Sequence, residues 1–216
     1  MHYKHRIAQR AAREVEAGQV INLGIGMPTL LMDYLPADQG IFVHSENGIW
    51  GMGKRAPAGS EKPDLIDAGA AYTTTVAGAA FFDTVTSFAI IRGGRVAVTF
   101  LGALEIGANG DLANWTIPGK MTPGIGGGME LAQKSLRVVV LTSHVTKNGA
   151  PKILNRCTLP LTAPECVSLI ITDLAVIAVT AEGLILKELA AGVSSDEVRE
   201  QTAAPLIVPE TALPRY

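Results

Sequence analysis

Residues 41–48 read IFVHSENG, an apolar run followed at once by polar turn residues. The run Ile41–His44 predicts a short buried strand, and Asn47-Gly48 predicts a turn directly after it. Glu46 is therefore expected at the corner between a strand and a loop, the edge of the sheet where α/β proteins bind their ligands. An exposed acid in an ordinary turn explains the same pattern, and the spacing alone does not decide between the two interpretations.

Helical and strand patterns alternate on both sides of this stretch. Helices are predicted for residues 4–17, from Pro28, for Thr84–Ile91 after the cap Asp83, from about Met129, and from the capping box of Ser194 and Glu197 to about Ala203. Strands are predicted at Val20–Leu23, Ile41–His44, Val96–Leu101, Val138–Thr142, Leu174–Val179 and Leu184–Leu186.

This alternation predicts an α/β fold with a mainly parallel sheet flanked by helices. We expect a single domain over residues 1–216, with a core at about 4–203 and a C-terminal tail at 204–216. The tail residues Leu206–Tyr216 are expected to be loose or bound to a partner. Residues 102–130 contain many glycines among apolar residues and are expected to form a loop that approaches a ligand closely.

The composition excludes several broad classes of function. The 216 residues are 48% hydrophobic with a formal net charge of -2, which gives no electrostatic attraction for nucleic acid or an anionic membrane. Cys157 and Cys166 show neither a CxxC spacing nor a nearby histidine, so neither a metal site nor a disulfide framework is predicted. The first residues lack the apolar core of a secretory signal, and no apolar run approaches the ~20 residues that span a bilayer. We therefore expect a soluble, cytoplasmic protein.

Glycines gather in two places that suit contact with a ligand. Residues 124–128 read GIGGG, and the N–H groups of Gly126, Gly127 and Gly128 could stabilise an oxyanion, with the following helix adding positive potential. A glycine-rich turn explains the same residues. Asn22 and the turn at residues 24–26, which reads GIG, could hold a phosphate or a carbonyl oxygen. The third glycine of a dinucleotide fingerprint and a Walker lysine are both absent there.

Other reactive side chains are interpreted as structural. His44 and His144 both lie beside apolar strands, where hydrogen-bonded core histidines are more common than catalytic ones. Cys157 has no obvious partner base, and no GxSxG motif is present to activate a serine.

A series of short motifs follows one another in a fixed order along residues 4–203. They are Asn22–Thr29, Ser45–Gly48 with Gly51 and Gly53, Asp64–Ile66, Ser87–Ala89, Ile91–Gly94, Leu101–Ala103, Asp111–Trp115, Pro118–Met121 and Lys152–Leu154. Together these motifs resemble the family I coenzyme A transferases, specifically the second, or beta, subunit of the 3-oxoacid and acetate type. The ordered series is far more specific than any one motif.

The resemblance implies the NagB/RpiA/CoA transferase-like fold and a role for each site residue. It makes Glu46 the nucleophile and the N–H of Gly127 a donor to the oxyanion, and it places Asn22 near the bound CoA. The remaining residues of the expected substrate and CoA site are Gly24, Gly26, Asn47, Gly126 and Gly128. Coenzyme A is implied as cosubstrate and covalent intermediate, without a metal or a permanently bound cofactor.

The resemblance also implies a partner and a range of reactions. Members need an alpha half, separate or fused, so this chain alone is expected to be inactive and to form a heterotetramer of two alpha and two beta subunits. The implied reaction moves CoA between a short-chain acyl-CoA or 3-oxoacyl-CoA and a carboxylic acid, for example acetoacetate with succinyl-CoA or acetyl-CoA. Acetate, butyrate and succinate are equally compatible acids.

Three positions depart from the family pattern. Residues 126–130 read GGGME, where the family usually has Ala and Asp at the third and fifth places, and Ala70 stands where many members carry a lysine. Two rival functions compete with CoA transfer. One is a non-catalytic ligand-binding domain of the same fold, which the retained Glu46 argues against, and the other is a dinucleotide oxidoreductase, which the incomplete glycine fingerprint argues against.

Overall fold

A ten-stranded sheet dominates the computed structural model, which describes residues 2–120 and 124–216. The strand order is β13-β12-β11-β10-β8-β5-β1-β2-β3-β4. The bounds of its strands are β1 Val20–Leu23, β2 Phe42–Ser45, β3 Ile49–Arg55, β4 Thr73–Phe81, β5 Val98–Leu101, β8 Arg137–Leu141, β10 Leu169–Ile171, β11 Ala175–Thr180, β12 Gly183–Leu189 and β13 Leu206–Ile207. A second, three-stranded sheet contains β6 Glu105–Gly107, β7 Leu112–Ala113 and β9 Ile153–Leu154.

The five central strands, from β10 to β2, are all parallel to one another. Antiparallel strands extend this centre on both sides, β3 and β4 beyond β2, and β11 and β12 beyond β10. The α/β fold with a mainly parallel sheet, predicted from the alternation of elements, is confirmed. The helices are α1 Tyr3–Ala11, α2 Thr84–Arg92, α3 Gly128–Lys134 and α4 Ser195–Glu200, with the 3-10 segments η1 Ala12–Glu14 and η2 Met27–Asp33.

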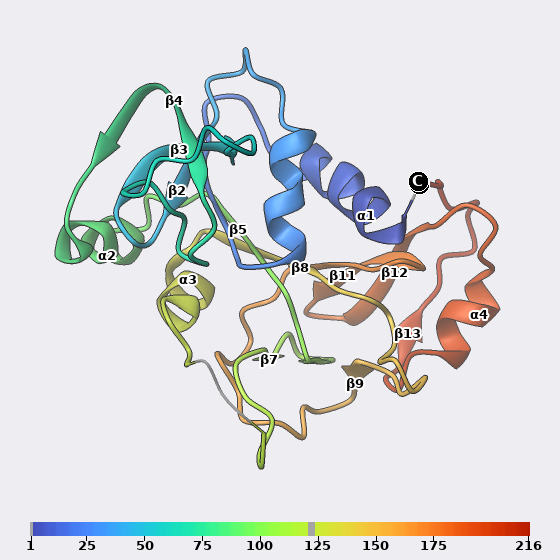
Figure 1. Cartoon of the computed structure of the whole chain (residues 1–216). Helices are drawn as coiled ribbons and strands as arrows, with labels where there is room; N and C mark the ends of the chain where they lie inside the picture. Colours follow the sequence, from blue (N-terminus) through green and yellow to red (C-terminus); the bar gives the residue numbers. More distant parts are fainter. Residues whose placement is uncertain (1, 121–123) are drawn as a thin grey trace.

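The two faces of the central strands are covered by different layers. On one face, α1 and η2 pack Ile7 and Leu31 against Ile21, Phe100 and other buried side chains of β1, β2, β5 and β8. The other face carries α2, α3 and the small sheet. Figure 1 shows α1 on one side of the central strands and β7 and β9 on the opposite side. The parallel strands are therefore buried on both faces, as sheets of this class require.

Several predicted elements differ from those observed. The first helix ends at Ala11 and continues as η1 rather than reaching residue 17, and the segment after Pro28 is a 3-10 helix. The loop-rich stretch 102–130 contains the short strands β6 and β7. The sequence patterns did not reveal β3 and β4, whose composition is rich in Gly, Ala and Thr. Met121, the last residue of one family motif, lies outside the described residues.

The prediction of a loose C-terminal tail is wrong in the isolated chain. Leu206–Ile207 forms β13 and pairs in parallel with β12. Tyr216 pairs through its backbone with Leu189 and Ala191, and its hydroxyl donates to the carbonyl of Thr172 at 2.5 Å. The tail is therefore part of the packed fold because its strand, its backbone and its last side chain are all bonded to neighbouring elements.

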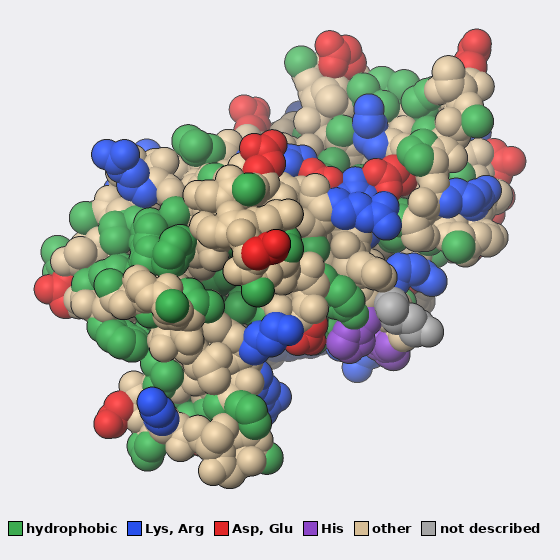
Figure 2. All heavy atoms as spheres, turned by 90° about the horizontal axis from the view of Figure 1, so that it is seen from above, with side chains coloured by type: hydrophobic (Ala, Val, Ile, Leu, Met, Phe, Trp, Pro, Cys, Tyr) green, Lys and Arg blue, Asp and Glu red, His purple; other side chains and the backbone are tan. Residues whose placement is uncertain are grey.

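Strand β4 forms the far edge of the large sheet and is mostly exposed. Its nine residues, TTTVAGAAF, carry no charge. Val76 and Phe81 are exposed, and Val85 follows at the start of α2. Figure 2 shows hydrophobic side chains gathered on the left, where Figure 1 places β4 and α2. An exposed, uncharged edge strand invites pairing or packing by another chain, because edge strands of monomers are commonly blunted by charges.

Both histidines interpreted as structural are fully buried and hydrogen-bonded. The Nε2 atom of His44 lies 3.0 Å from Ser87 Oγ, and His144 lies within 3.0 Å of the hydroxyls of Thr172 and Thr202. Burial lowers the pKa of both His44 and His144 from 6.5 to about 4. Both rings are therefore neutral in the folded protein at neutral pH.

The helices of the described residues were compared with the length and hydrophobicity that a membrane span needs. None of them reaches both.

The burial of His44 and His144 predicts a loss of stability on mild acidification. The unfolded chain takes up protons below about pH 6.5 that the folded chain binds only near pH 4, so the free energy of unfolding falls across that interval. We expect a loss on the order of 1 kcal/mol per histidine by pH 5.5. Urea unfolding at pH 7.5 and at pH 5.5 measures this difference in the free energy of unfolding. His144→Gln should reduce the pH dependence, and an unchanged dependence in that variant would contradict the assignment.

Candidate active site

Glu46 follows the last residue of β2, at the edge where the carboxyl ends of three parallel strands meet. Gly24 follows β1 and Gly102 follows β5, and both flank the same cavity as Glu46. In the sheet β1 lies between β2 and β5, so the chain reverses its direction of progress across the sheet at β1. This reversal point is the crevice in which open α/β sheets bind their ligands.

The side-chain alternation of the strands directs Glu46 toward the face covered by α2 and α3. Asn22 on β1 is the partner of His44 on β2, and both are buried on that face. Glu46 lies two residues beyond His44 and continues the same alternation. The Nδ2 atom of Asn22 donates to the carbonyl of His44 at 3.0 Å and lies 3.5 Å from Glu46 Oε2. Asn22 is thus held by the strand and reaches the carboxylate.

The glycine cluster lies directly against the Glu46 side chain. A Cβ atom added at Gly127 would lie 3.2 Å from Glu46 Cγ, 3.3 Å from Glu46 Oε1 and 3.3 Å from Phe88 Cζ. Gly126 has a positive φ of +54°, and a Cβ there would lie 4.0 Å from Glu46 Oε1. The N–H groups of Gly126 and Gly127 donate to no described residue. They are therefore available to bind an oxygen near the carboxylate.

Packing between α2 and α3 holds this cluster in place. Arg92 on α2 pairs with Glu130 on α3 at 2.8 Å, and its guanidinium lies 5.5 Å from the centre of the Phe88 ring. Phe88 itself contacts Gly127, and Leu131 of α3 is buried with Ile91 of α2. Glu130, which replaces the aspartate usual in the resembled family, therefore has a defined partner. Arg92 is mostly exposed, so this ion pair positions α3 more than it stabilises the fold.

A cavity of about 540 Å³ opens in front of Glu46. Of the predicted site residues, Gly24, Glu46, Gly126 and Gly128 line it, and Asn22 and Gly127 lie behind Glu46. Its other described lining residues come from four loops, the end of β5, and α3, and are Ile25, Ala68, Leu101, Gly102, Ala103, Leu104, Asn114, Trp115, Gly124, Ile125 and Leu131.

Two further predicted site residues, Asn47 and Gly26, also do not line this cavity. Asn47 is exposed, and its amide donates to the carbonyl of Ile66 at 2.8 Å, which ties the turn to the next loop. Gly26 caps η2 with a φ of +93°, a conformation that favours glycine, and nothing lies within 4 Å of an added Cβ. Both residues shape the backbone beside the site. Ala70 also has a positive φ, of 62°, and lies beside the cavity-lining loop residue Ala68.

Sequence reasoning missed the apolar walls of the cavity. Ala68, whose own N–H donates to Ser45 Oγ at 3.2 Å, lines the cavity from a loop with no predicted role, and Leu104 lines it from a stretch predicted only as loop. Phe88 of α2 lies beside Gly127 without lining the cavity. The chain carries one signal for them, since the motifs at Ser87–Ala89 and Leu101–Ala103 adjoin these residues. Nothing in local periodicity shows that they meet Glu46.

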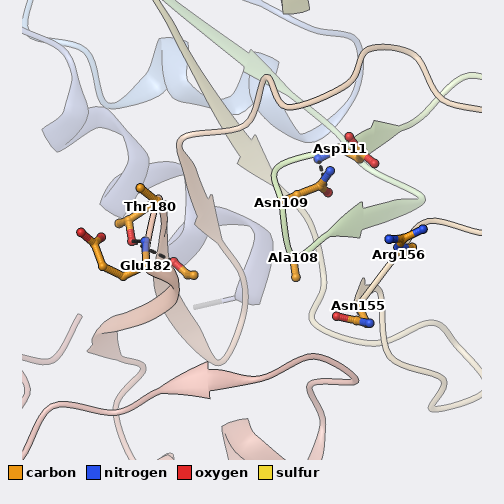
Figure 3. Close-up of a pocket in the computed structure, with 9 residues that line it drawn as sticks. Ala108, Asn109, Asp111, Asn155, Arg156, Thr180 and Glu182 are labelled. Atoms are coloured by element: carbon orange, nitrogen blue, oxygen red, sulfur yellow. Dashed lines mark hydrogen bonds between the residues drawn. The ribbon is translucent and has the colours of Figure 1, made fainter.

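A larger cavity, of about 790 Å³, lies elsewhere in the chain. Figure 3 shows its lining, with Asn109 and Asp111 on one side, Asn155 and Arg156 on another, and Thr180 and Glu182 at the β11–β12 turn. It is lined by none of the predicted site residues. Its dashed hydrogen bonds, from Asp111 N to Asn109 Oδ1 and from Glu182 N to Thr180 Oγ1, are local turn contacts. The candidate active site is therefore the smaller cavity.

Outside this site, the described residues show neither an activated cysteine thiol nor a cluster of side chains suited to a metal ion. Burial raises the pKa of the Cys157 thiol to about 11 and that of Cys166 to about 12, so neither is a ready thiolate. Among the described residues, no three His, Cys, Asp or Glu side chains gather in a way that could hold a metal ion.

Comparison with known proteins identifies the family. Residues 4–201 match the family model described as Coenzyme A transferase. The chain is 48% identical over 203 residues to the probable coenzyme A transferase beta subunit of Bacillus subtilis, covering 94% of both proteins. It is 47% identical over 205 residues to one of the subunits of the 3-oxoadipate CoA-transferase of Acinetobacter baylyi, again covering 94% of both.

A solved structure shares the fold. The apoenzyme of the acyl-CoA transferase YdiF from Escherichia coli O157:H7 has a TM-score of 0.76 at 19% identity, covering 99% of this chain and 43% of that one. Fold and matches together define the class of the protein, an enzyme that transfers a chemical group. The chain belongs to the coenzyme A transferase family, as the ordered sequence motifs predict.

The contact between Gly127 and Glu46 yields a direct test. Gly127→Ala should reduce the rate of CoA transfer by roughly tenfold, because a methyl group 3.2–3.3 Å from Glu46 and Phe88 forces the carboxylate to shift by a few tenths of an ångström. Gly128→Ala makes the same chemical change, but its Cβ meets only Thr162 Cγ2, at 3.8 Å, so its loss should be much smaller. Steady-state kinetics and the melting temperatures of both variants are compared. Equal rates for the two variants would contradict the proposed geometry.

Proposed function

We propose that this chain is the glutamate-bearing, catalytic subunit of a coenzyme A transferase that moves CoA from an acyl-CoA to a carboxylic acid. The observation that carries the proposal is the close approach of the Gly126 and Gly127 backbone to the Glu46 side chain, beside a cavity at the carboxyl edge of the sheet. Membership of the coenzyme A transferase family supports the reaction class.

The first half-reaction transfers CoA to Glu46. One oxygen of the Glu46 carboxylate attacks the thioester carbonyl of an acyl-CoA, the C–S bond breaks, and the products are an acyl-glutamyl anhydride and the CoA thiolate. The thiolate then attacks the glutamyl carbonyl and expels the acyl group as its carboxylate, which leaves a glutamyl-CoA thioester. The free N–H groups of Gly126 and Gly127 would donate to the oxyanions formed in these steps.

The second half-reaction returns CoA to an acid. The carboxylate of an acceptor acid attacks the glutamyl thioester, releasing the CoA thiolate and forming a new mixed anhydride. The thiolate attacks the acyl carbonyl, and the products are a new acyl-CoA and the free Glu46 carboxylate. The energy of the thioester is conserved throughout, so the reaction needs neither ATP nor a metal ion. Because the donor acid leaves before the acceptor binds, the kinetics should be ping-pong.

We propose that the active enzyme contains an alpha partner, in an assembly of two alpha and two beta subunits. The names of the Bacillus and Acinetobacter relatives are those of subunits, and the YdiF chain is more than twice as long as the part that this chain matches. The exposed, uncharged edge strand β4 supports a contact with another chain.

We also propose a cytoplasmic location. Cys157 and Cys166 are both free thiols, which suits a reducing compartment.

Substitution of Glu46 tests the nucleophile. In a complex with the alpha partner, Glu46→Gln keeps the shape of the side chain but lacks the attacking oxygen, and transfer should fall by roughly a thousandfold or more. Glu46→Asp retracts the carboxylate and should cost on the order of a hundredfold. Both variants should melt near the wild-type temperature, because the side chain of Glu46 makes a single, long hydrogen bond to the described residues.

The matched control is Glu210→Gln, an exposed acid in the C-terminal tail, which should leave turnover normal. Near-normal turnover by Glu46→Gln would sink the nucleophile assignment. A well-folded wild-type complex that binds CoA but transfers it to no acid would favour the alternative of a non-catalytic ligand-binding domain.

A further inference from the structure

The cavity in front of Glu46 is poor in charge. Glu46 is the one ionisable side chain among its described lining residues, and no lysine, arginine or histidine is among them. Six of its fifteen described lining residues have large apolar side chains, and they are Ile25, Leu101, Leu104, Trp115, Ile125 and Leu131. Ile25 is largely exposed in this single chain and projects beside the site.

The polar side chains of the wall already have partners. The Nδ2 atom of Asn114 donates to the carbonyl of Gly102 at 3.0 Å, and its Oδ1 accepts from Thr162 Oγ1 at 2.6 Å. The indole N–H of Trp115 donates to the carbonyl of Leu161 at 3.2 Å. These bonds turn the polar atoms of both residues toward the protein. The hydrogen-bond donors left for a substrate include the backbone N–H groups of Gly126 and Gly127 beside Glu46, and none of the described lining residues offers a positively charged donor.

Two lysines of the segments around the cavity, Lys152 and Lys120, do not line it. Lys152 lies beside the wall, but its Nζ atom donates to Thr142 Oγ1 at 2.8 Å and lies 3.4 Å from the carbonyl of Ala103. Burial lowers the pKa of Lys152, which weakens it further as a permanent charge. Lys120 is exposed on the surface of the 102–130 stretch. A second carboxylate inside this cavity would therefore lose its hydration without gaining an ion pair from this chain.

We infer that the enzyme selects acids whose acyl chain carries no charge beyond the reacting carboxyl group, and so discriminates against dicarboxylic acids and their CoA esters. The inference rests on the proposed function and narrows the range of acids that the resemblance allows, which includes succinate. Leu104 and Trp115 are the residues of this wall that would contact an uncharged chain. Each methylene added to a short chain should raise kcat/KM about fourfold as it is buried, until the cavity is full.

The test compares acids of equal length in the complex with the alpha partner. Butyrate and succinate both have four carbons and differ by one terminal carboxylate in place of a methyl group. We expect kcat/KM for butyrate, with acetyl-CoA as donor, to exceed that for succinate at least a hundredfold. Comparable values would overturn the selectivity while leaving CoA transfer intact. Transfer to neither acid, nor to acetate or acetoacetate, would instead reject the proposed function.

Variants that should gain activity with succinate test whether this wall sets the selectivity. Leu104→Lys, and separately Ala68→Lys, place a cation in the cavity, and each should raise the ratio of succinate to butyrate kcat/KM at least tenfold. The two positions belong to different loops, so that one variant remains if the other fails to fold. Ile207→Lys adds the same charge on exposed β13 and should leave the ratio unchanged. An unmoved ratio in a folded Leu104→Lys or Ala68→Lys complex would overturn the inference.

Discussion

The close approach of the Gly127 backbone to the Glu46 side chain is the constraint on which the site depends. A single methyl group at Gly127 would lie within 3.3 Å of three atoms of its neighbours, so the carboxylate and the glycine loop must be placed together. Parallel pairing of β1, β2 and β5 fixes the carboxylate, and the packing of α3 on α2 fixes the loop. The site is therefore a property of the whole sheet and its covering layer, rather than of one motif.

A buried polar layer beneath the site links these two parts. Asn22, His44 and Thr99 are fully buried on the face covered by α2 and α3, and Ser87 and Ser135 supply hydroxyl partners for His44 and Thr99. Polar groups in a core cost free energy unless they are paired, so this layer admits few alternative arrangements of the helices. The Oδ1 atom of Asn22 has no partner among the described atoms, although the residue is fully buried. The unpaired oxygen of Asn22 costs some folding stability, while the paired groups of the layer fix the position of Glu46.

The sequence predicts the central sheet better than its margins. The run Val20–Leu23 is apolar and bounded by glycine, and it forms the strand as predicted. Strands β3 and β4 escape prediction because Gly51, Gly53 and Gly78 interrupt their patterns, and they are strands only because each pairs with its neighbour. Spacing alone leaves Glu46 open between a turn and a site, and the prediction of a site rests on the resemblance of the ordered motifs. No local pattern shows that the fold brings Gly127 beside Glu46. The 3-10 geometry of η2 and the pairing of the C-terminal tail depend on contacts distant in sequence.

The central claim is that Glu46 carries CoA covalently, and mass spectrometry of its peptide tests this claim most directly. The chain and its alpha partner are incubated with acetoacetyl-CoA in the absence of an acceptor acid, digested, and the peptide containing Glu46 is weighed. We predict an adduct of the mass of CoA on Glu46 that disappears when acetate is added. A well-folded complex that binds CoA but shows no adduct on Glu46 with any short acyl-CoA would contradict the account.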